Sequence, residues 1–245
     1  MNSFPIPAPA FDGRGRAVAA GAVFAWLRFG WNVFMASPGL WAASAAILIA
    51  GFLALMFVWL IGPLLAGLLA PVLAAGLLGM CRKAADEKRL ALSDLMEGFT
   101  GRAAPLMLLG VIFMLASLAI ELVAVALFGG SVAGGLMLSG AAGLGLMLGG
   151  SILALLLSSL LAIPLWMAMW FAPALVLFSG VSPVEACKAS FAACLKNVLP
   201  FVILGLVVFV LCFFAMLPAG LGFLVLIPVL AGTAYASWQD VFVVH

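Results

Sequence analysis

Long uncharged stretches alternate with short charged segments along this chain. The basic residues fall into three groups, and the C-terminal segment carries Asp240 and His245 but no Lys or Arg. The groups are Arg14, Arg16 and Arg28; Arg82, Lys83, Lys88, Arg89 and Arg102; and Lys188 and Lys196. Because a bilayer-crossing helix needs about 20 apolar residues, each stretch between groups has room for two. Since basic residues stay on the cytoplasmic side, the pattern predicts paired spans with both termini inside.

The hydrophobic stretches predict six spans, arranged as three helical hairpins. The nine glycines between residues 129 and 150 weaken helix formation and predict a connection inside the middle hairpin. The alternative is that residues 134–150 belong to an overlong helix or a re-entrant segment, with the same topology. Gly62 and Pro63 are expected to form the first turn. The expected spans are residues 40–61, 63–80, 105–128, 151–178, 198–217 and 221–238.

Composition places the chain among all-α, polytopic membrane proteins. Hydrophobic residues make up 68% of it and charged residues 7%, whereas charged residues are about a quarter of a soluble domain. The net charge of +2 is too small and scattered to indicate a nucleic-acid partner. Residues 1–15 are expected to be a flexible N-terminus, and residues 16–245 a single transmembrane domain.

A threefold pattern runs through the hydrophobic stretches. The second span of each hairpin contains a proline followed by small and branched apolar residues. These tetrapeptides are Pro71-Val-Leu-Ala, Pro173-Ala-Leu-Val and Pro228-Val-Leu-Ala. A segment of helical periodicity precedes each hairpin, so we expect a hairpin with a cytoplasmic interfacial helix, used three times.

Two of the interfacial segments have clear helical signals. Ser182-Pro-Val-Glu185 has the residues of a capping box with proline at the first helical position. The helix is expected to lie on the cytoplasmic surface or to pack under the bundle, with one apolar stripe: Val184, Cys187, Phe191, Cys194, Leu195 and Val198. In the first segment a second stripe shares one face: Val18, Ala22, Trp26, Phe29 and Val33. The side chains expected to face lipid at the interface are Arg28, Trp31, Phe34, Lys188, Phe191 and Lys196.

Four motifs carry a family resemblance. They are Gly30-Trp31-x-x-Phe34-x-x-x-Pro38-x-x-Trp41, Phe171-Ala-Pro173-Ala-Leu-Val, Ser190-Phe-x-Ala-Cys194-Leu-Lys-Asn197 and Tyr235-Ala-Ser-Trp-Gln-Asp240. From about Arg16 onward the chain resembles the BPSS-type family of uncharacterised proteobacterial inner-membrane proteins. It is more distantly similar to YciC-type proteins and to the membrane domain of some glycerophosphodiester phosphodiesterases. The resemblance implies a multi-pass protein of the bacterial inner membrane with six helices. The resemblance implies no catalytic residue. In the phosphodiesterases the catalytic residues belong to a soluble barrel, and the resemblance does not extend to that barrel.

Residues able to support catalysis are scarce. The single histidine is His245. No histidine is therefore available inside the expected fold for a Ser-His-Asp arrangement or a histidine metal site. We therefore expect no enzyme, no cofactor and no metal site. Cys187 and Cys194, seven residues apart, are either a metal or acylation pair or, as we favour, small apolar side chains.

Glu121 is the one carboxylate inside an expected span. A buried charge there is costly and therefore indicates a proton or cation site, unless Glu121 lies near the periplasmic interface and reaches water. Pro71, Pro173 and Pro228 could break helices at a substrate path, or be packed kinks.

Three functions follow from these features. The favoured one is a noncatalytic platform that contacts membrane lipids or envelope proteins, with a homo-oligomer as an open alternative. The second is a small transporter or permease that uses Glu121 and the prolines. The third is a lipid enzyme with a polar cluster on the cytoplasmic loop, formed by Asp86, Glu87, Arg89, Asp94, Glu97 and Arg102.

Overall fold

Helices are the only regular secondary structure among the residues that the structure describes, which confirms the all-α prediction. It is a computed structural model that describes residues 15–59, 61–100, 102–138 and 140–243. The expected flexible segment, residues 1–15, lies outside the described residues except for Gly15. The elements are α1 (Ala22–Ala36), α2 (Pro38–Met56), α3 (Ile61–Ala85), η1 (Leu92–Phe99), α4 (Ala103–Met137), α5 (Gly140–Trp170), α6 (Ala172–Ala174), η2 (Leu175–Ser179), α7 (Pro183–Lys196), α8 (Val198–Met216) and α9 (Phe223–Phe242).

Five helical stretches in the described part of the chain are long and apolar enough to cross a membrane. They are α2, α3, α4, the stretch from α5 to η2, and α8. The sixth expected span corresponds to α9, which is not among them. Its second half carries polar residues that lower its hydropathy, including Thr233, Tyr235, Gln239 and Asp240.

The glycine-rich segment is helical, so the predicted connection over residues 129–150 is wrong and the overlong-helix alternative is right. α4 has 35 residues and α5 has 31, and the chain turns between Met137 and Gly140. A Cβ on Gly143 would lie 2.5 Å from the Gly135 carbonyl oxygen, and one on Gly150 would lie 2.1 Å from Ser131 Cβ. Glycine here permits close contact between two backbones, and that packing outweighs its low helix propensity.

The first turn also lies elsewhere than expected. α2 ends at Met56 and α3 begins at Ile61, so Gly62 and Pro63 belong to the first turn of α3. Proline is tolerated there because the first amides of a helix have no intrahelical acceptor. A Cβ on Gly62 would lie 1.7 Å from the Leu55 carbonyl oxygen, so glycine is required for the close return of the chain.

The short helices close the three hairpins into a ring. Helix η1 packs on α3, α7 packs on α5 and α6, and α1 packs on α9. Each short helix therefore covers the second helix of the preceding hairpin, and the first short helix covers the last hairpin. Two of these contacts involve equivalent glycines: a Cβ on Gly98 would lie 2.0 Å from the Val72 oxygen, and one on Gly30 would lie 2.2 Å from the Val229 oxygen. Val72 and Val229 each follow the repeat proline, so two of the three repeats share this contact.

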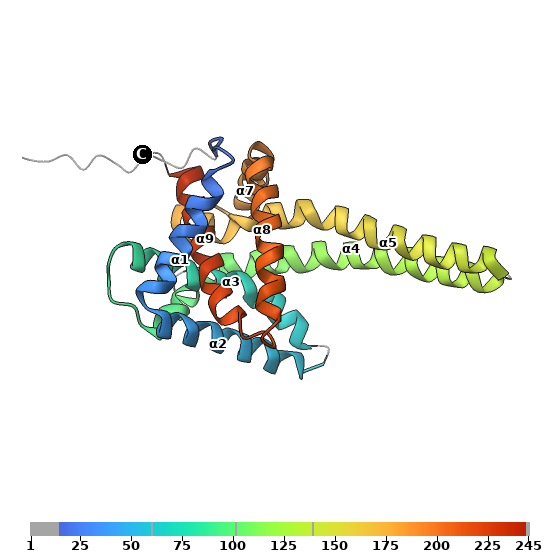
Figure 1. Cartoon of the computed structure of the whole chain (residues 1–245), viewed down its shortest axis with the longest axis horizontal. Coiled ribbons are helices and arrows are strands. Elements are labelled where there is room, and N and C mark those ends of the chain that lie inside the picture. Colours follow the sequence, from blue (N-terminus) through green and yellow to red (C-terminus); the bar gives the residue numbers. More distant parts are fainter. Residues whose placement is uncertain (1–14, 60, 101, 139, 244–245) are drawn as a thin grey trace, which may run out of the picture.

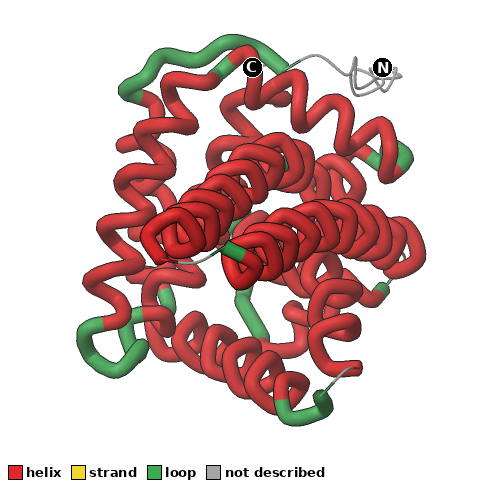
Figure 2. The backbone as a smooth tube through the Cα atoms, turned by 90° about the vertical axis from the view of Figure 1, so that its right-hand side faces the viewer, coloured by secondary structure: helices red, strands yellow, loops and turns green. Residues whose placement is uncertain are grey.

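The hairpins point in different directions. In Figure 1, α4 and α5 run horizontally away from the other helices, whereas α8 and α9 run nearly vertically. Figure 2 looks toward the tip of the α4–α5 hairpin, with its two helices side by side in front. Leucines along the outer half of this hairpin are exposed, for example Leu122, Leu148 and Leu155. Such a surface is apolar enough to require a nonaqueous neighbour.

Candidate functional site

The two described ends of the chain meet beside Asp240 in α9. The Arg16 side chain donates hydrogen bonds to the Asp240 carboxylate and to its backbone carbonyl. Trp26 Nε1 donates to the second carboxylate oxygen at 2.9 Å. The Arg16 amide donates to the Val241 carbonyl, also at 2.9 Å. One acidic side chain thus joins the N-terminal segment, α1 and α9.

Asn197, which the sequence reasoning did not select as a site residue, fixes the same N-terminal segment to the end of α7. Its buried side chain accepts from the Val18 amide at 2.8 Å and donates to the carbonyls of Arg16 and Ala193, each at 2.9 Å. Lys196, expected to face lipid, donates through Nζ to the Gly15 carbonyl at 3.0 Å. An asparagine at a helix end was the available signal, because its amide both donates and accepts.

Basic residues in the last turn of α3 form ion pairs with acidic residues of η1. Arg82 contacts Glu97 at 2.6 Å, and Lys83 contacts Asp94 at 2.8 Å and Glu97 at 3.9 Å. Burial alone would raise the pKa of Asp94, but the hydrogen bonds from Lys83 and from the Ala91 amide, with the Lys83 charge, lower it below its ordinary value. These ion pairs account for Asp94 and Glu97 as structural contacts between η1 and α3.

Arg82 extends this network to the end of the second hairpin. Its guanidinium lies 5.0 Å from the centre of the Phe178 ring, and Phe178 packs against Trp238 with ring centres 4.7 Å apart. Side chains from α3, η2 and α9 therefore meet at one place.

The outer face of α1 carries an exposed stripe of aromatic, basic and apolar side chains. Phe24, Arg28, Trp31 and Met35 recur at helical spacing and are all exposed, Trp31 to 49%. We call these four residues the α1 stripe. Phe34, also expected to face lipid, differs: it is only 7% exposed, because it lies on the face of α1 that turns to the core.

Helix α7 begins as the sequence predicts, but a different face of it is covered. The Ser182 hydroxyl accepts from the Glu185 amide, and the Glu185 carboxylate accepts from the Ser182 amide, each at 3.3 Å, so the capping box is confirmed. Lys188 is exposed and Phe191 is half-buried. Of the expected stripe, Val184, Leu195 and Val198 are exposed. The covered face consists of small residues instead: Ala186, Ala189, Ser190, Ala193 and Cys194.

The repeat prolines lie in the core. Pro71 and Pro228 are inside α3 and α9, and Pro173 lies where α5 gives way to the π-helix η2. All three are buried. Gly180 ends η2 with φ +69°, a backbone conformation that glycine adopts without a steric penalty.

The two cysteines of α7 have the environment of apolar side chains. Cys194 is buried, and its thiol donates to the Met167 carbonyl at 3.5 Å. Burial raises the pKa of the Cys194 thiol to about 12 and also raises that of Cys187. Burial therefore makes both thiols harder to ionise than a free cysteine, which disfavours metal binding and acylation.

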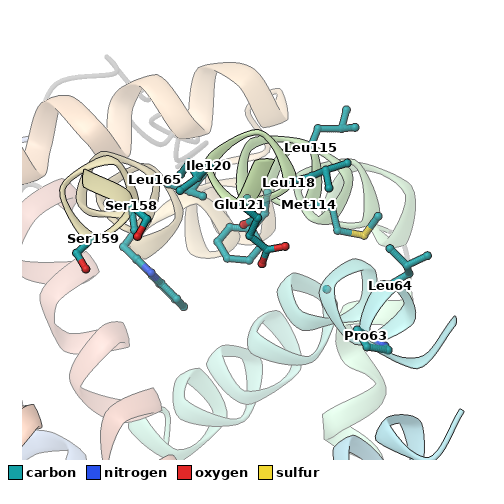
Figure 3. Close-up of a pocket in the computed structure, with 15 residues that line it drawn as sticks. Pro63, Leu64, Met114, Leu115, Leu118, Ile120, Glu121, Ser158, Ser159 and Leu165 are labelled. Atoms are coloured by element: carbon teal, nitrogen blue, oxygen red, sulfur yellow. The ribbon is translucent and has the colours of Figure 1, made fainter. Parts of the chain in front are cut away.

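Glu121 lies in a groove between α3, α4 and α5. The groove has a volume of about 600 Å³, and Pro63, Leu64 and Gly67 of α3 form one wall. In Figure 3 the Glu121 side chain extends into the space between α4 and α3, while Ser158 and Ser159 project from α5. None of Pro71, Pro173 and Pro228 lines it. The structure therefore does not bring Glu121 and the prolines together.

Comparison with known proteins gives this chain no relative: no protein-family model, curated protein or solved structure matches it.

Proposed function

We propose that this chain is a multi-pass protein of a bacterial inner membrane that acts as a noncatalytic platform. The segments that carry its Lys and Arg residues would face the cytoplasm. Five of its described helices are long and apolar enough to cross a membrane. The α1 stripe would then lie at the membrane surface and contact lipid headgroups or envelope proteins. The exposed stripe is the observation that carries the proposal.

The composition of the stripe supports this role. Trp and Arg are suited to the headgroup region, because each combines an apolar body with a polar or charged end. The opposite face of α1 is fixed to α9, with Trp26 hydrogen-bonded to Asp240. A rigidly held helix with an amphipathic outer face is suited to presenting a surface.

The separation of Glu121 from the prolines favours the platform over the transporter. A transport path of the kind considered would need the carboxylate and the helix breaks in one cavity. The prolines are buried in the packed core, and the groove at Glu121 lies elsewhere.

A photoreactive residue placed in the α1 stripe tests the platform directly. At position 31 it should form adducts with the mass of a phospholipid when membranes are irradiated. Position 34, on the same helix but 7% exposed, is the matched control and should give few adducts. Equal yields at both positions, or neither a lipid nor a protein adduct at position 31, would contradict the proposal. A protein adduct in place of lipid would assign the stripe to an envelope partner.

Thiol labelling tests the orientation. Glu87→Cys lies in the loop after α3 and Ala219→Cys in the turn after α8, each introduced into a chain whose four cysteines are replaced by alanine. A membrane-impermeant maleimide should label position 219 in intact cells and position 87 only after lysis. Labelling of both positions from the same side would overturn the topology.

A further inference from the structure

Glu121 lies near the middle of a continuous apolar helix. α4 runs from Ala103 to Met137, so its end is roughly 24 Å beyond Glu121 at 1.5 Å per residue. The sequence offered a simple reason for this carboxylate, that it lies near the end of its span and reaches water. The helix continues past the expected end at residue 128, so Glu121 lies near the middle of α4 and not near its end.

The groove around Glu121 combines this charge with hydroxyl groups and one indole ring. Ser117 of α4 and Ser158 and Ser159 of α5 line it, together with Trp166. Glu121 is the one charged side chain among the described residues that line it. The Ser158 hydroxyl donates to the Leu155 carbonyl at 3.0 Å, which leaves its oxygen free to accept. Trp166 is exposed, and its ring lies 5.5 Å from that of Phe113, which also lines the groove.

These groups select a particular ligand chemistry. A carboxylate and hydroxyl oxygens accept hydrogen bonds, and an ammonium group supplies three N–H donors. An exposed indole face adds attraction for a cation. Ca²⁺ takes six to eight oxygen ligands, more than one carboxylate and three hydroxyls provide without added water. An anionic headgroup would meet Glu121 without any basic side chain to offset the repulsion.

The other residues that line the groove favour an amphiphilic ligand over a small cation. Leu64, Met114, Leu115, Leu118 and Leu165 are apolar, and the groove is far larger than a hydrated ion requires. It is open along helices whose exposed surface is suited to lipid. The molecules that reach such a groove are the membrane's own lipids.

We infer that the Glu121 groove binds the ammonium headgroup of an aminophospholipid, of the phosphatidylethanolamine type. Glu121 and the serine hydroxyls accept from the ammonium group, Trp166 covers it, and an acyl chain lies along the leucines. The inference rests on the membrane insertion that we propose, but not on the platform role or on the α1 stripe.

Native mass spectrometry of the detergent-purified protein tests the inference. The protein is titrated with phospholipids that share their acyl chains and differ in headgroup: ethanolamine, choline and glycerol. The wild type should retain the ethanolamine lipid over the glycerol lipid. Glu121→Gln should reduce that preference about tenfold, as expected for the loss of one charge-assisted hydrogen bond, and Glu121→Asp should restore part of it.

Glu87→Gln is the matched control, since it removes the same charge from an exposed loop and should leave the preference unchanged. An unchanged preference in Glu121→Gln, an equal loss in Glu87→Gln, or a wild-type preference for the glycerol lipid would overturn the inference. Alkaline extraction of membranes separates the two proposals. Release of the wild type by carbonate would defeat membrane insertion itself, whereas retention without a headgroup preference would defeat only the lipid site.

Discussion

The hydroxyl of Ser190 accepts a hydrogen bond from the backbone amide of Phe171 at 3.0 Å. The same hydroxyl donates to the Met167 carbonyl at 2.6 Å. In an uninterrupted helix the Phe171 amide would donate directly to Met167. Ser190 of α7 is therefore inserted into the hydrogen-bond ladder of α5, two residues before Pro173, and this insertion accounts for the end of α5 at Trp170.

Replacing Ser190 with alanine should destabilise the protein by about 1–3 kcal/mol, because the buried Phe171 amide loses its partner and the Met167 carbonyl keeps only the longer bond from Cys194. The measurement is thermal unfolding in detergent, followed by circular dichroism. Ser151→Ala is the control: its hydroxyl bonds only to a carbonyl of its own helix, Met147, so its effect should stay within roughly 0.5 kcal/mol. Equal stability of the two variants would show that the insertion contributes little.

The contact between α1 and α9 should be intolerant of a single methyl group at Gly30. A Cβ there would lie 2.2 Å from the Val229 oxygen and 2.9 Å from Thr233 Oγ1. We expect Gly30→Ala to cost about 1–3 kcal/mol in unfolding free energy, measured by urea or detergent denaturation. Gly51→Ala, in α2 with open space around it, should be neutral or stabilising by up to about 1 kcal/mol. A destabilised Gly51→Ala together with an unaffected Gly30→Ala would contradict this packing.

Two adjacent glycines of α5 should respond differently to alanine. Gly150 faces Ser131 of α4, whereas a Cβ on Gly149 would have no neighbour within 4 Å. Gly150→Ala should therefore separate the two helices and speed hydrogen exchange of amides near Ser131. Gly149→Ala should slow exchange slightly, since alanine favours helix. If residues 129–150 were a flexible connection, both variants would exchange rapidly and alike.

The ion pair between Lys83 and Asp94 predicts a pH dependence of stability. Because the pKa of Asp94 is lower in the folded protein than in the unfolded chain, its contribution is fully present above the unfolded pKa of about 3.9. It is lost as the pH falls through the folded pKa. Asp94→Asn should thus cost a few tenths to about 1 kcal/mol at neutral pH, and the difference from wild type should vanish in acid. Unfolding curves at pH 7 and below pH 3 measure this, and a difference that persists in acid would contradict the assignment.

The elements that sequence determines locally could be predicted. Serine, proline and glutamate at 182, 183 and 185 define the start of α7 because a capping box depends on four neighbouring residues. The long apolar stretches define the hairpins because a helix in lipid must bond its own backbone. The span at α8 is an example, predicted over residues 198–217 and observed over Val198–Met216.

The features that depend on a neighbouring helix could not be predicted. Among the glycines between residues 129 and 150, Gly130 and Gly145 have no neighbour within 4 Å, whereas Gly135, Gly143 and Gly150 make close contacts with the facing helix. The covered face of α7 depends on how closely α5 packs against it. Small side chains allow this close packing, whereas larger apolar side chains do not. Ser190 looks like any helical serine until α5 is placed beside it.

Ring closure of the three hairpins bears on how the protein unfolds. In a linear array the outer repeats have only one neighbour and can fray independently. Here each short helix covers another hairpin, with α1 on α9 completing the circuit, so each hairpin unit has a neighbour on both sides. Loss of any one hairpin uncovers surfaces on both others. Unfolding should therefore be cooperative over the whole ring and begin at no particular repeat.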